Sequence, residues 1–500
     1  MARRGGRRDA IIGQMTQLLK ASPTGCPSPP HRRRRAMTEF FKHQKEVFDR
    51  SVNKPYWALF MDAGTGKTLI SIRTAEYWFT NQDIDAVIVF CPKSLIGTWS
   101  DYELAKHSEV LYNTYKWDPA KPNKEDFAKK LKDKSKLFYF IVNHDAFASD
   151  KIVPFLNAIV KHTKFGVIYD ESTAIKNIST DRTQQATAVA RHAQFRRILT
   201  GTPIVQSPLD VFSQTEFLEK GALGFKNFYG FKTRYAIIKR ATFGPRSFDV
   251  IEGYRDLDDL RQKLEQFSSF VKLEDCVDLP DQVFKQIEIE LTKEQSVAYE
   301  ELRDKALLYI EEHEITAVNA LAMLTRLQQI VAGQLKTPDG SYVSLKNNRL
   351  TALKELVEST TEPFIVWSTF VNTSIDILKT LSLNALTFTS NTNPEQRNDV
   401  INAWRGGSAQ VLVLNPQSAG HGLTLNEAKQ SVFYNGFFNL EWRLQALRRN
   451  YRIGQTSKTV VNDFITRGTV EEKAYAALNA KEDLAKKVTS KDALLQILSK

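Results

Sequence analysis

Cysteine is scarce in this chain of 500 residues, which contains only Cys26, Cys91 and Cys276. The three residues lie far apart, form no CxxC pair and are not accompanied by a close pair of histidines. This pattern excludes a disulfide framework and a zinc site. A reducing, intracellular compartment is therefore expected.

Long apolar runs are also missing. No stretch approaches 18 apolar residues, and the longest strongly apolar pieces, such as 87–90, have the length of buried strands. A transmembrane helix is therefore not expected, and no membrane partner is predicted. With 42% hydrophobic and 25% charged residues, the composition is that of a globular protein. At roughly 150 residues per domain, the length indicates about three units rather than one small module.

The basic residues are unevenly distributed along the chain. Residues 1–36 hold nine Lys and Arg against one acid, Asp9, so this segment carries +8 of the net charge of +12. It also contains the Pro/Ser/Gly run SPTGCPSPP, so we expect a disordered basic tail over 1–37. The RRRR run at 32–35 is either a solvated segment or a nuclear-import or nucleic-acid patch, and Met37 is an alternative start. The remaining residues carry only +4, so any nucleic-acid surface on them must be local.

Two series of short apolar runs predict two parallel sheets. The runs are WALF (57–60), VIVF (87–90), FYFIV (138–142), GVIY (166–169), ILT (198–200), FIVW (364–367), ALTF (385–388), VLVL (411–414), VFYN (432–435) and VVNDFI (460–465). They are too short for helices and lack polar alternation, as is typical of parallel strands that are buried on both faces. Helical stretches between them, for example 68–79, would supply the crossovers. The predicted fold class is α/β, with two doubly wound parallel-sheet lobes.

The segment between the two series has a different pattern. Its apolar residues recur every three or four positions, which indicates packed helices. The recurring residues are Leu302, Ala306, Tyr309, Leu321, Leu324 and Leu327. The expected division is a tail at 1–37, a first lobe at 38–203, a helical insertion or linking subdomain at 204–345, a second lobe at 346–478 and terminal helices at 479–500.

The motif MDAGTGKT at 61–68 follows a predicted strand and opens a predicted helix, which is the context of a phosphate-binding loop. Two glycines let the backbone curl so that its N–H groups face an anionic phosphate chain. Lys67 would neutralise the terminal phosphates, and the Thr68 hydroxyl would bind Mg²⁺. Met61 replaces the usual first glycine, so only the shorter GxGKT pattern is met. The expected nucleotide-binding residues of the loop are Gly64, Thr65, Gly66, Lys67 and Thr68.

Two further pieces of sequence carry the groups that a phosphate-transfer site needs. In GVIYDEST (166–173) an apolar strand delivers two adjacent acids at its carboxyl end, where α/β sheets bind ligands. Asp170 would hold Mg²⁺, and Glu171 would orient and deprotonate the attacking water. In QALRRNYRIGQ (445–455), Arg449 and Arg452 lie three apart on one helical face, where guanidinium groups could meet phosphate charge. Taken alone, the latter could be a basic surface helix.

Together, the loop, the acid pair and the arginine helix resemble helicase superfamily two in order and spacing. Within it they are most similar to the DNA-translocating ATPases of the switch/sucrose-nonfermenting type. The resemblance runs from about residue 38 to 480. It implies two RecA-like lobes, use of ATP and Mg²⁺, and binding of double-stranded DNA without sequence preference. The compactness of the chain looks more like that of a bacterial or viral member, so we expect a cytoplasmic protein of a bacterium or viral host rather than a nuclear one. A monomer is also expected.

The resemblance also assigns roles to residues outside the three motifs. FKHQKEVFDR (41–50) looks like the motif that reads adenine, with Gln44 in that role, and SAGHGLTL (418–425) looks like a glycine-rich motif near DNA and nucleotide. Gly422 would then approach the nucleotide, and Thr202 would help couple the ATP site to the DNA track. The residues implied in nucleic-acid binding are Lys93, Ser94, Thr200, Gly201, Ser368, Ser418, Gly420 and Gln445. By the same resemblance, Gln445, Arg449 and Arg452 face the cleft.

Two departures from the family pattern remove no group needed for hydrolysis, and the first concerns the residue that couples hydrolysis to movement. Thr173 stands where the family usually has histidine, and the charged stretch before the phosphate loop is shortened to MDA. The predicted function is an ATP-dependent double-stranded DNA translocase that hydrolyses ATP between two RecA-like lobes to move along or remodel DNA and protein–DNA complexes. Two alternatives stay open: a strand-separating or annealing and branch-migrating helicase, and a non-catalytic nucleic-acid scaffold with a decayed ATP site.

Overall fold

The computed structural model describes residues 39–204, 207–243, 246–276, 280–312, 317–337, 339–388, 392, 394–416, 425–436, 440–452 and 455–479. The predicted basic tail at 1–37 lies outside this part, as do residues 480–500 of the predicted terminal helices. Among the described residues, no helix combines the length and the apolarity needed to cross a bilayer.

The first sheet has seven strands in the order β3-β4-β2-β5-β6-β1-β9, and every pair is parallel. The strands are β1 (Tyr56–Met61), β2 (Ala86–Cys91), β3 (Tyr112–Lys116), β4 (Leu137–Asn143), β5 (Phe165–Asp170), β6 (Phe195–Thr200) and β9 (Ser268–Val271). Each of the five apolar runs of the first series is one of these strands, and β2 and β5 are buried along their whole length. Hydrophobic residues of this sheet and its helices form one continuous core.

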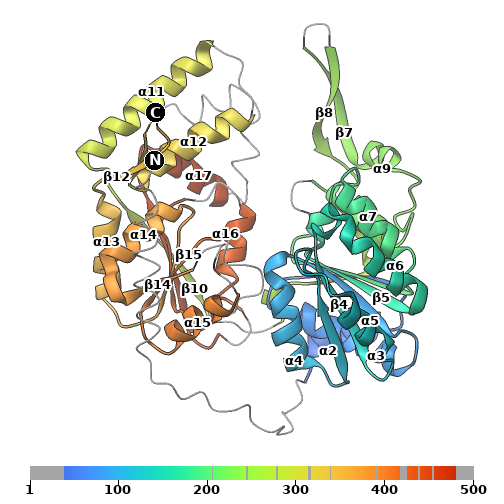
Figure 1. Ribbon diagram of the computed structural model, residues 1–500. Helices are drawn as coiled ribbons and strands as arrows, with labels where there is room; N and C mark the ends of the chain where they lie inside the picture. Colours follow the sequence, from blue (N-terminus) through green and yellow to red (C-terminus); the bar gives the residue numbers. More distant parts are fainter. Residues whose placement is uncertain are drawn as a thin grey trace. The chain divides into compact units, whose positions relative to one another are not determined.

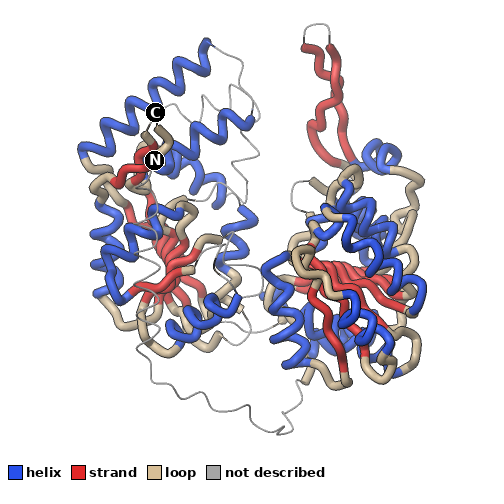
Figure 2. Tube along the Cα trace, in the orientation of Figure 1, coloured by secondary structure: helices blue, strands red, loops and turns tan. Residues whose placement is uncertain are grey.

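Helices lie on either side of the first sheet (Figure 1). They are α2 (Lys42–Ser51), α3 (Lys67–Thr80), α4 (Leu104–His107), α5 (Lys124–Lys132), α6 (Val153–His162), α7 (Asp181–Ala190), α8 (Asp210–Leu218), α9 (Phe228–Tyr235) and α10 (Leu257–Glu265). Short helical turns join some of them, including the 3-10 turns η1 (Lys93–Leu95) and η5 (Ser172–Ile175) and the π-helix η2 (Thr98–Glu103). An antiparallel hairpin, β7 (Ala236–Phe243) with β8 (Arg246–Tyr254), projects beyond the neighbouring helices (Figure 2).

The second sheet has six strands in the order β10-β17-β16-β13-β15-β14, again in parallel pairs. They are β10 (Gln282–Glu288), β13 (Phe364–Trp367), β14 (Ala385–Thr387), β15 (Val411–Leu414), β16 (Gln430–Phe433) and β17 (Thr459–Ile465). Successive side chains of a strand point to opposite faces. Accordingly, Phe364 and Val366 belong to one hydrophobic cluster, and Ile365 and Trp367 belong to another.

The second sheet also has its own helices. They are α11 (Lys293–Glu312), α12 (Ala317–Val331), α13 (Asn348–Glu358), α14 (Val371–Leu381), α15 (Pro394–Arg405), α16 (Leu440–Leu447) and α17 (Val470–Asn479). A small antiparallel pair, β11 (Gln334–Lys336) with β12 (Tyr342–Ser344), follows α12. The topology confirms the predicted fold class of two parallel-sheet α/β lobes.

Segment 204–345 holds more than the helices expected there. It does contain α8–α12, but it also supplies the β7–β8 hairpin and one strand to each sheet. β9 pairs with β1 of the first sheet, and β10 pairs with β17 of the second. The segment therefore takes part in both lobes. Its strands escaped the sequence analysis because they are short or carry many polar residues, so they form no apolar run.

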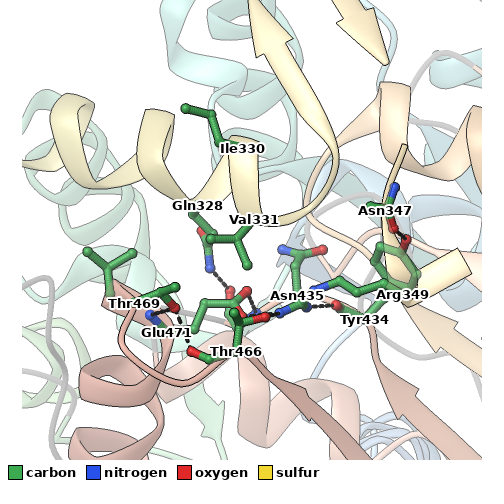
Figure 3. Close-up of polar contacts among 12 residues, drawn as sticks. Gln328, Ile330, Val331, Asn347, Arg349, Tyr434, Asn435, Thr466, Thr469 and Glu471 are labelled. Carbon is green, nitrogen blue, oxygen red and sulfur yellow. Dashed lines mark hydrogen bonds and ion pairs between the residues drawn. The ribbon is translucent and has the colours of Figure 1, made fainter. Parts of the chain in front are cut away.

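A buried polar network joins several elements of the second lobe (Figure 3). The guanidinium of Arg349 on α13 forms an ion pair with Glu471 on α17, and both side chains are 1% exposed. Arg349 also donates to the Tyr434 carbonyl and, over 2.8 Å, to the Thr466 hydroxyl. The backbone N–H of Gly436 donates to the other Glu471 oxygen over 3.1 Å. The network fixes the chain that follows β16 against two helices.

Candidate active site

The loop between β1 and α3 has the backbone shape of an anion-binding loop. Gly64 and Gly66 have φ angles of 87° and 95°, a left-handed region that L side chains rarely adopt. A Cβ on Gly66 would also collide with the side chain of Gln44. Lys67 begins α3, so the N-terminal N–H groups of this helix open toward the loop. Thr68 lies in the first turn of the same helix.

Gln44 on α2 holds this loop from the side. Its side-chain N–H donates to the carbonyl of Thr65 over 3.1 Å, and its carbonyl oxygen accepts from the backbone N–H of Phe41 over 3.0 Å. The ring Nε2 of His43 lies 2.9 Å from the same Thr65 carbonyl. Gln44 is buried, so it supports the loop itself. Its role in reading adenine stays a prediction.

Lys67 folds back onto its own loop. Its Nζ donates to the carbonyls of Met61, over 2.8 Å, and Asp62, over 3.1 Å. Burial lowers the pKa of the Lys67 ammonium below its ordinary value. The charged groups that act on this ammonium are the carboxylates of Glu171 and Asp170, which raise its pKa, and the guanidinium groups of Arg448 and Arg452, which lower it. The loop lysine, the acid pair and two arginines of the 448–452 segment therefore lie within electrostatic reach of one another.

The acid pair stands at the carboxyl end of β5. Asp170 is the last residue of the strand and is 7% exposed. Its Oδ2 accepts from the indole N–H of Trp99 over 2.9 Å, and its Oδ1 accepts from the backbone N–H of Glu171 over 3.0 Å. Glu171 itself has φ 52° and ψ 60°. Non-glycine residues held in this left-handed region are strained, and such strain concentrates at functional sites.

The arginines lie in the turn that follows α16, so Arg449 and Arg452 do not share a helical face as their spacing predicted. Burial lowers the pKa of Arg449 to about 10, Arg452 adds to this shift, and Glu171 opposes it. Arg452 lies so close to the phosphate loop that a Cβ on Gly64 would be 2.9 Å from the Cβ of Arg452. Arg448 forms an ion pair of 2.7 Å with Asp62.

The family models match the two halves of this arrangement. The SNF2-related domain matches residues 53–334, and the helicase conserved C-terminal domain matches residues 348–454. The chain belongs to the SNF2-related family. The resemblance to helicase superfamily two that the motifs carry is thereby confirmed.

Several SNF2-related and helicase proteins are similar to this chain. It is 25% identical over 448 residues to the putative ATP-dependent helicase/translocase YwqA of Bacillus subtilis, covering 85% of this chain and 45% of that protein. It is 23% identical to the putative protein p41 of Acyrthosiphon pisum secondary endosymbiont phage 1, covering 84% of this chain and 91% of that protein. Among solved structures, the Sulfolobus solfataricus SWI2/SNF2 ATPase core in complex with dsDNA matches with a TM-score of 0.41 and 22% identity, covering 93% of this chain and 95% of that one. The chain spans less than half the length of its bacterial helicase relatives.

The residues predicted to bind nucleic acid differ in exposure. Lys93 and Ser94 are exposed on the 3-10 turn η1. Thr200 and Ser368 are 0% exposed. The Thr200 hydroxyl accepts from the backbone N–H of Thr202, and the Ser368 hydroxyl donates to the carbonyl of Phe370. In this conformation neither hydroxyl reaches the surface, so a DNA contact at these positions would need the adjacent backbone or a rearrangement.

The remaining predicted residues are placed as follows. Gly201 lies beside the second-half arginines, since a Cβ on it would be 3.2 Å from a guanidinium nitrogen of Arg448. Gln445 lies within α16 and is partly exposed. Ser418, Gly420 and Gly422 lie outside the described residues.

Three residues near the site were not singled out from the sequence. They are His43, which contacts the phosphate loop, Trp99, which binds Asp170, and Arg448, which pairs with Asp62. His43 and Arg448 stand inside motifs that the sequence analysis quoted, and Trp99 follows the predicted contacts Lys93 and Ser94 by a few residues. Adjacency to a recognised residue was therefore the available signal, but the contact partner could not be read from it.

The donor set around Asp170 fits Mg²⁺ rather than a fully protein-enclosed metal. Among the described residues, no group of three or more His, Cys, Asp or Glu could hold a metal ion. Mg²⁺ keeps several of its waters and takes one or two protein oxygens together with substrate phosphates. The Asp170 carboxylate and the Thr68 hydroxyl are oxygen donors of that kind.

Proposed function

We propose that this chain is an ATP-driven translocase that moves on double-stranded DNA. The observation that carries the proposal is the set of charges around Lys67, because it joins residues of the phosphate loop, of the β5 acid pair and of the 448–452 segment. These are the groups that a P-loop ATPase with arginine fingers needs at one nucleotide. In this proposal residues 38–203, completed by β9, form the ATP-binding lobe, and residues 346–478, completed by β10, form the lobe that supplies the arginines.

Each group has a distinct part in hydrolysis. Lys67 would exchange its bonds to loop carbonyls for bonds to the phosphate chain and neutralise part of its charge. Glu171 would orient the attacking water and accept its proton. Arg449 and Arg452 would stabilise the negative charge of the transferring phosphoryl group. The lowered pKa of Arg449, to about 10, still leaves its guanidinium charged at neutral pH.

Mg²⁺, when bound, would supply positive charge that neutralises part of the charge developing on the phosphates. Thr68 and Asp170 are the residues that would hold it. The backbone N–H of Glu171 and the indole N–H of Trp99 fix the Asp170 carboxylate before any ion arrives.

DNA movement would follow from the difference in ATP affinity between two arrangements of the lobes. A nucleotide that bound both arrangements with equal affinity would not change their relative populations. Lys93 and Ser94, exposed on η1, are suited to contact the DNA backbone. Contacts to phosphates rather than bases would make binding insensitive to sequence and sensitive to salt.

The decisive experiment compares ATP turnover on duplex, single-stranded and forked DNA of equal nucleotide concentration. We expect the strongest stimulation by duplex, together with displacement of a third strand from a triplex, which reports movement without unwinding. Stimulation by single strands alone would overturn duplex tracking and favour the strand-separating alternative. If ATP turnover were absent with every DNA substrate, the non-catalytic scaffold would be the remaining alternative.

A further inference from the structure

The indole of Trp99 is bonded to the carboxylate expected to hold Mg²⁺. Its Nε1–H donates to Oδ2 of Asp170 over 2.9 Å, and the two side chains are 1% and 7% exposed. An indole N–H is a donor only, so the direction of this bond is not in doubt. A hydrogen bond to a buried, ionised carboxylate is among the stronger ones in a protein.

The local backbone is built around this contact. Trp99 belongs to η2, a π-helix over Thr98–Glu103. π-helical turns are rare and occur often at functional sites. The turn follows η1 within a few residues, and η1 carries the exposed Lys93 and Ser94. One short segment thus holds Asp170 at one point and presents expected DNA contacts at another.

Other buried indoles of the chain show that core packing does not require a carboxylate partner. Trp78 is 0% exposed, and its N–H donates to the carbonyl of Val52 over 2.8 Å. Trp57 is 2% exposed, and its N–H donates to the Ser269 hydroxyl over 3.0 Å. Both acceptors are neutral groups. Burial alone therefore does not explain why the Trp99 indole donates to the Asp170 carboxylate.

We propose that Trp99 is a positioning residue for the magnesium site. This inference rests on the proposed function. The indole N–H holds the Asp170 carboxylate in one rotamer. A carboxylate oxygen can accept from more than one partner, so the indole and a metal ion can share the group. Partners that orient a metal ligand in this way typically contribute about 10- to 100-fold to metal affinity.

The test replaces Trp99 with Phe in the full chain, which removes the N–H and keeps an aromatic ring in the core. Trp78→Phe is the matched control, because it removes an equally buried indole N–H that donates to the Val52 carbonyl and not to the acid pair. The readout is the anisotropy of a fluorescent ADP analogue, which reports binding without turnover. For each variant, Mg²⁺ is titrated, and the concentration that gives half of the metal-dependent gain in binding is measured.

We expect Trp99→Phe to raise that Mg²⁺ concentration by about tenfold or more, with ADP binding in EDTA unchanged. Trp78→Phe should leave the Mg²⁺ dependence unchanged. Equal Mg²⁺ dependence in Trp99→Phe and Trp78→Phe would overturn the inference. A loss of ADP binding in EDTA as large as the loss in Mg²⁺ would also overturn it, because that result indicates general damage to the nucleotide loop.

A second pair of variants keeps the test open if Trp99→Phe does not fold. The ring of Trp99→His retains an N–H donor, and the side chain of Trp99→Met does not. The His variant should need less Mg²⁺ than the Met variant, and equal requirements would refute the role of the N–H. Failure of the proposed function is a separate outcome: the unaltered chain would then show no DNA-stimulated turnover, whatever its Mg²⁺-dependent ADP binding.

Discussion

Replacing Arg349 with Met should strongly destabilise the second lobe. The guanidinium donates to the Tyr434 carbonyl and the Thr466 hydroxyl and pairs with the Glu471 carboxylate (Figure 3). Both charged side chains are 1% exposed, so water cannot replace the lost partner. Removing one member of such a pair leaves an uncompensated buried charge, which costs about 3–5 kcal/mol. Loss of a donor for the Tyr434 carbonyl adds to the same effect.

The double variant Arg349→Met/Glu471→Met tests whether the uncompensated charge is the cause. Removing both charges together should cost about 1–3 kcal/mol less than the sum of the single changes. Arg467→Met is the matched control, since Arg467 pairs with Glu288 in the same lobe with 72% and 50% of the two side chains exposed. An exposed pair of this kind contributes about 0–1 kcal/mol.

The assay measures amide hydrogen exchange at increasing urea concentrations. Peptides from β13 and β16 report the opening of the second sheet separately from that of the first. The free energy of opening of these peptides should fall in Arg349→Met and hardly change in Arg467→Met. If the two single variants lowered it equally, the argument from burial would be refuted. Strict additivity in the double variant would show that the two charges do not depend on each other.

Three further predictions concern the first lobe. Glu171→Gln should keep nucleotide binding but lower ATP turnover by at least about 100-fold, because the amide cannot accept a proton; unchanged phosphate release would remove Glu171 from the reaction. Gly66→Ala should weaken nucleotide binding, because alanine disfavours a φ of 95° by about 1 kcal/mol or more and its Cβ meets a neighbouring side chain. In Gly340→Ala, at φ 82° with no atom within 4 Å of the new Cβ, binding measured by anisotropy should match that of the unaltered chain. Burial raises the pKa of both described thiols, and it raises that of the buried Cys91 well above its usual range, so iodoacetamide at pH 8 should label the partly exposed Cys276 faster than Cys91; equal labelling rates of these two residues by mass spectrometry would contradict this.

The strands that the sequence revealed and those it did not differ in their place in the sheets. All ten predicted apolar runs are strands, and most of these strands have a neighbour on each side. The strands that were not foreseen in the two sheets, β3, β9 and β10, are all edge strands. β10 is largely exposed along its length, and β9 has only four residues. An edge strand buries less side-chain area, so its sequence needs no apolar run and periodicity cannot find it.

The candidate site was also predictable only in part. The phosphate loop and the acid pair are contiguous motifs, so their residue types and spacing are visible in the sequence. The contacts Trp99–Asp170 and Arg448–Asp62 join residues that are far apart in the chain. Nothing in the local pattern states which distant carboxylate an indole or a guanidinium will meet. Such pairs depend on how the strands are ordered in the sheets, which composition and periodicity leave open.

The position of β9 has a consequence for how this polypeptide is synthesised and subcloned. β1 pairs with β6 on one side and with β9 on the other, and Trp57–Met61 of β1 are fully buried. In a fragment that ended at residue 203, β1 would be an exposed, apolar edge strand. Such an edge promotes pairing and aggregation between molecules. During synthesis on the ribosome, this edge of β1 has no partner strand until Val271, the last residue of β9, has emerged from the exit tunnel. A soluble fragment of the amino-terminal body should accordingly extend at least through Val271.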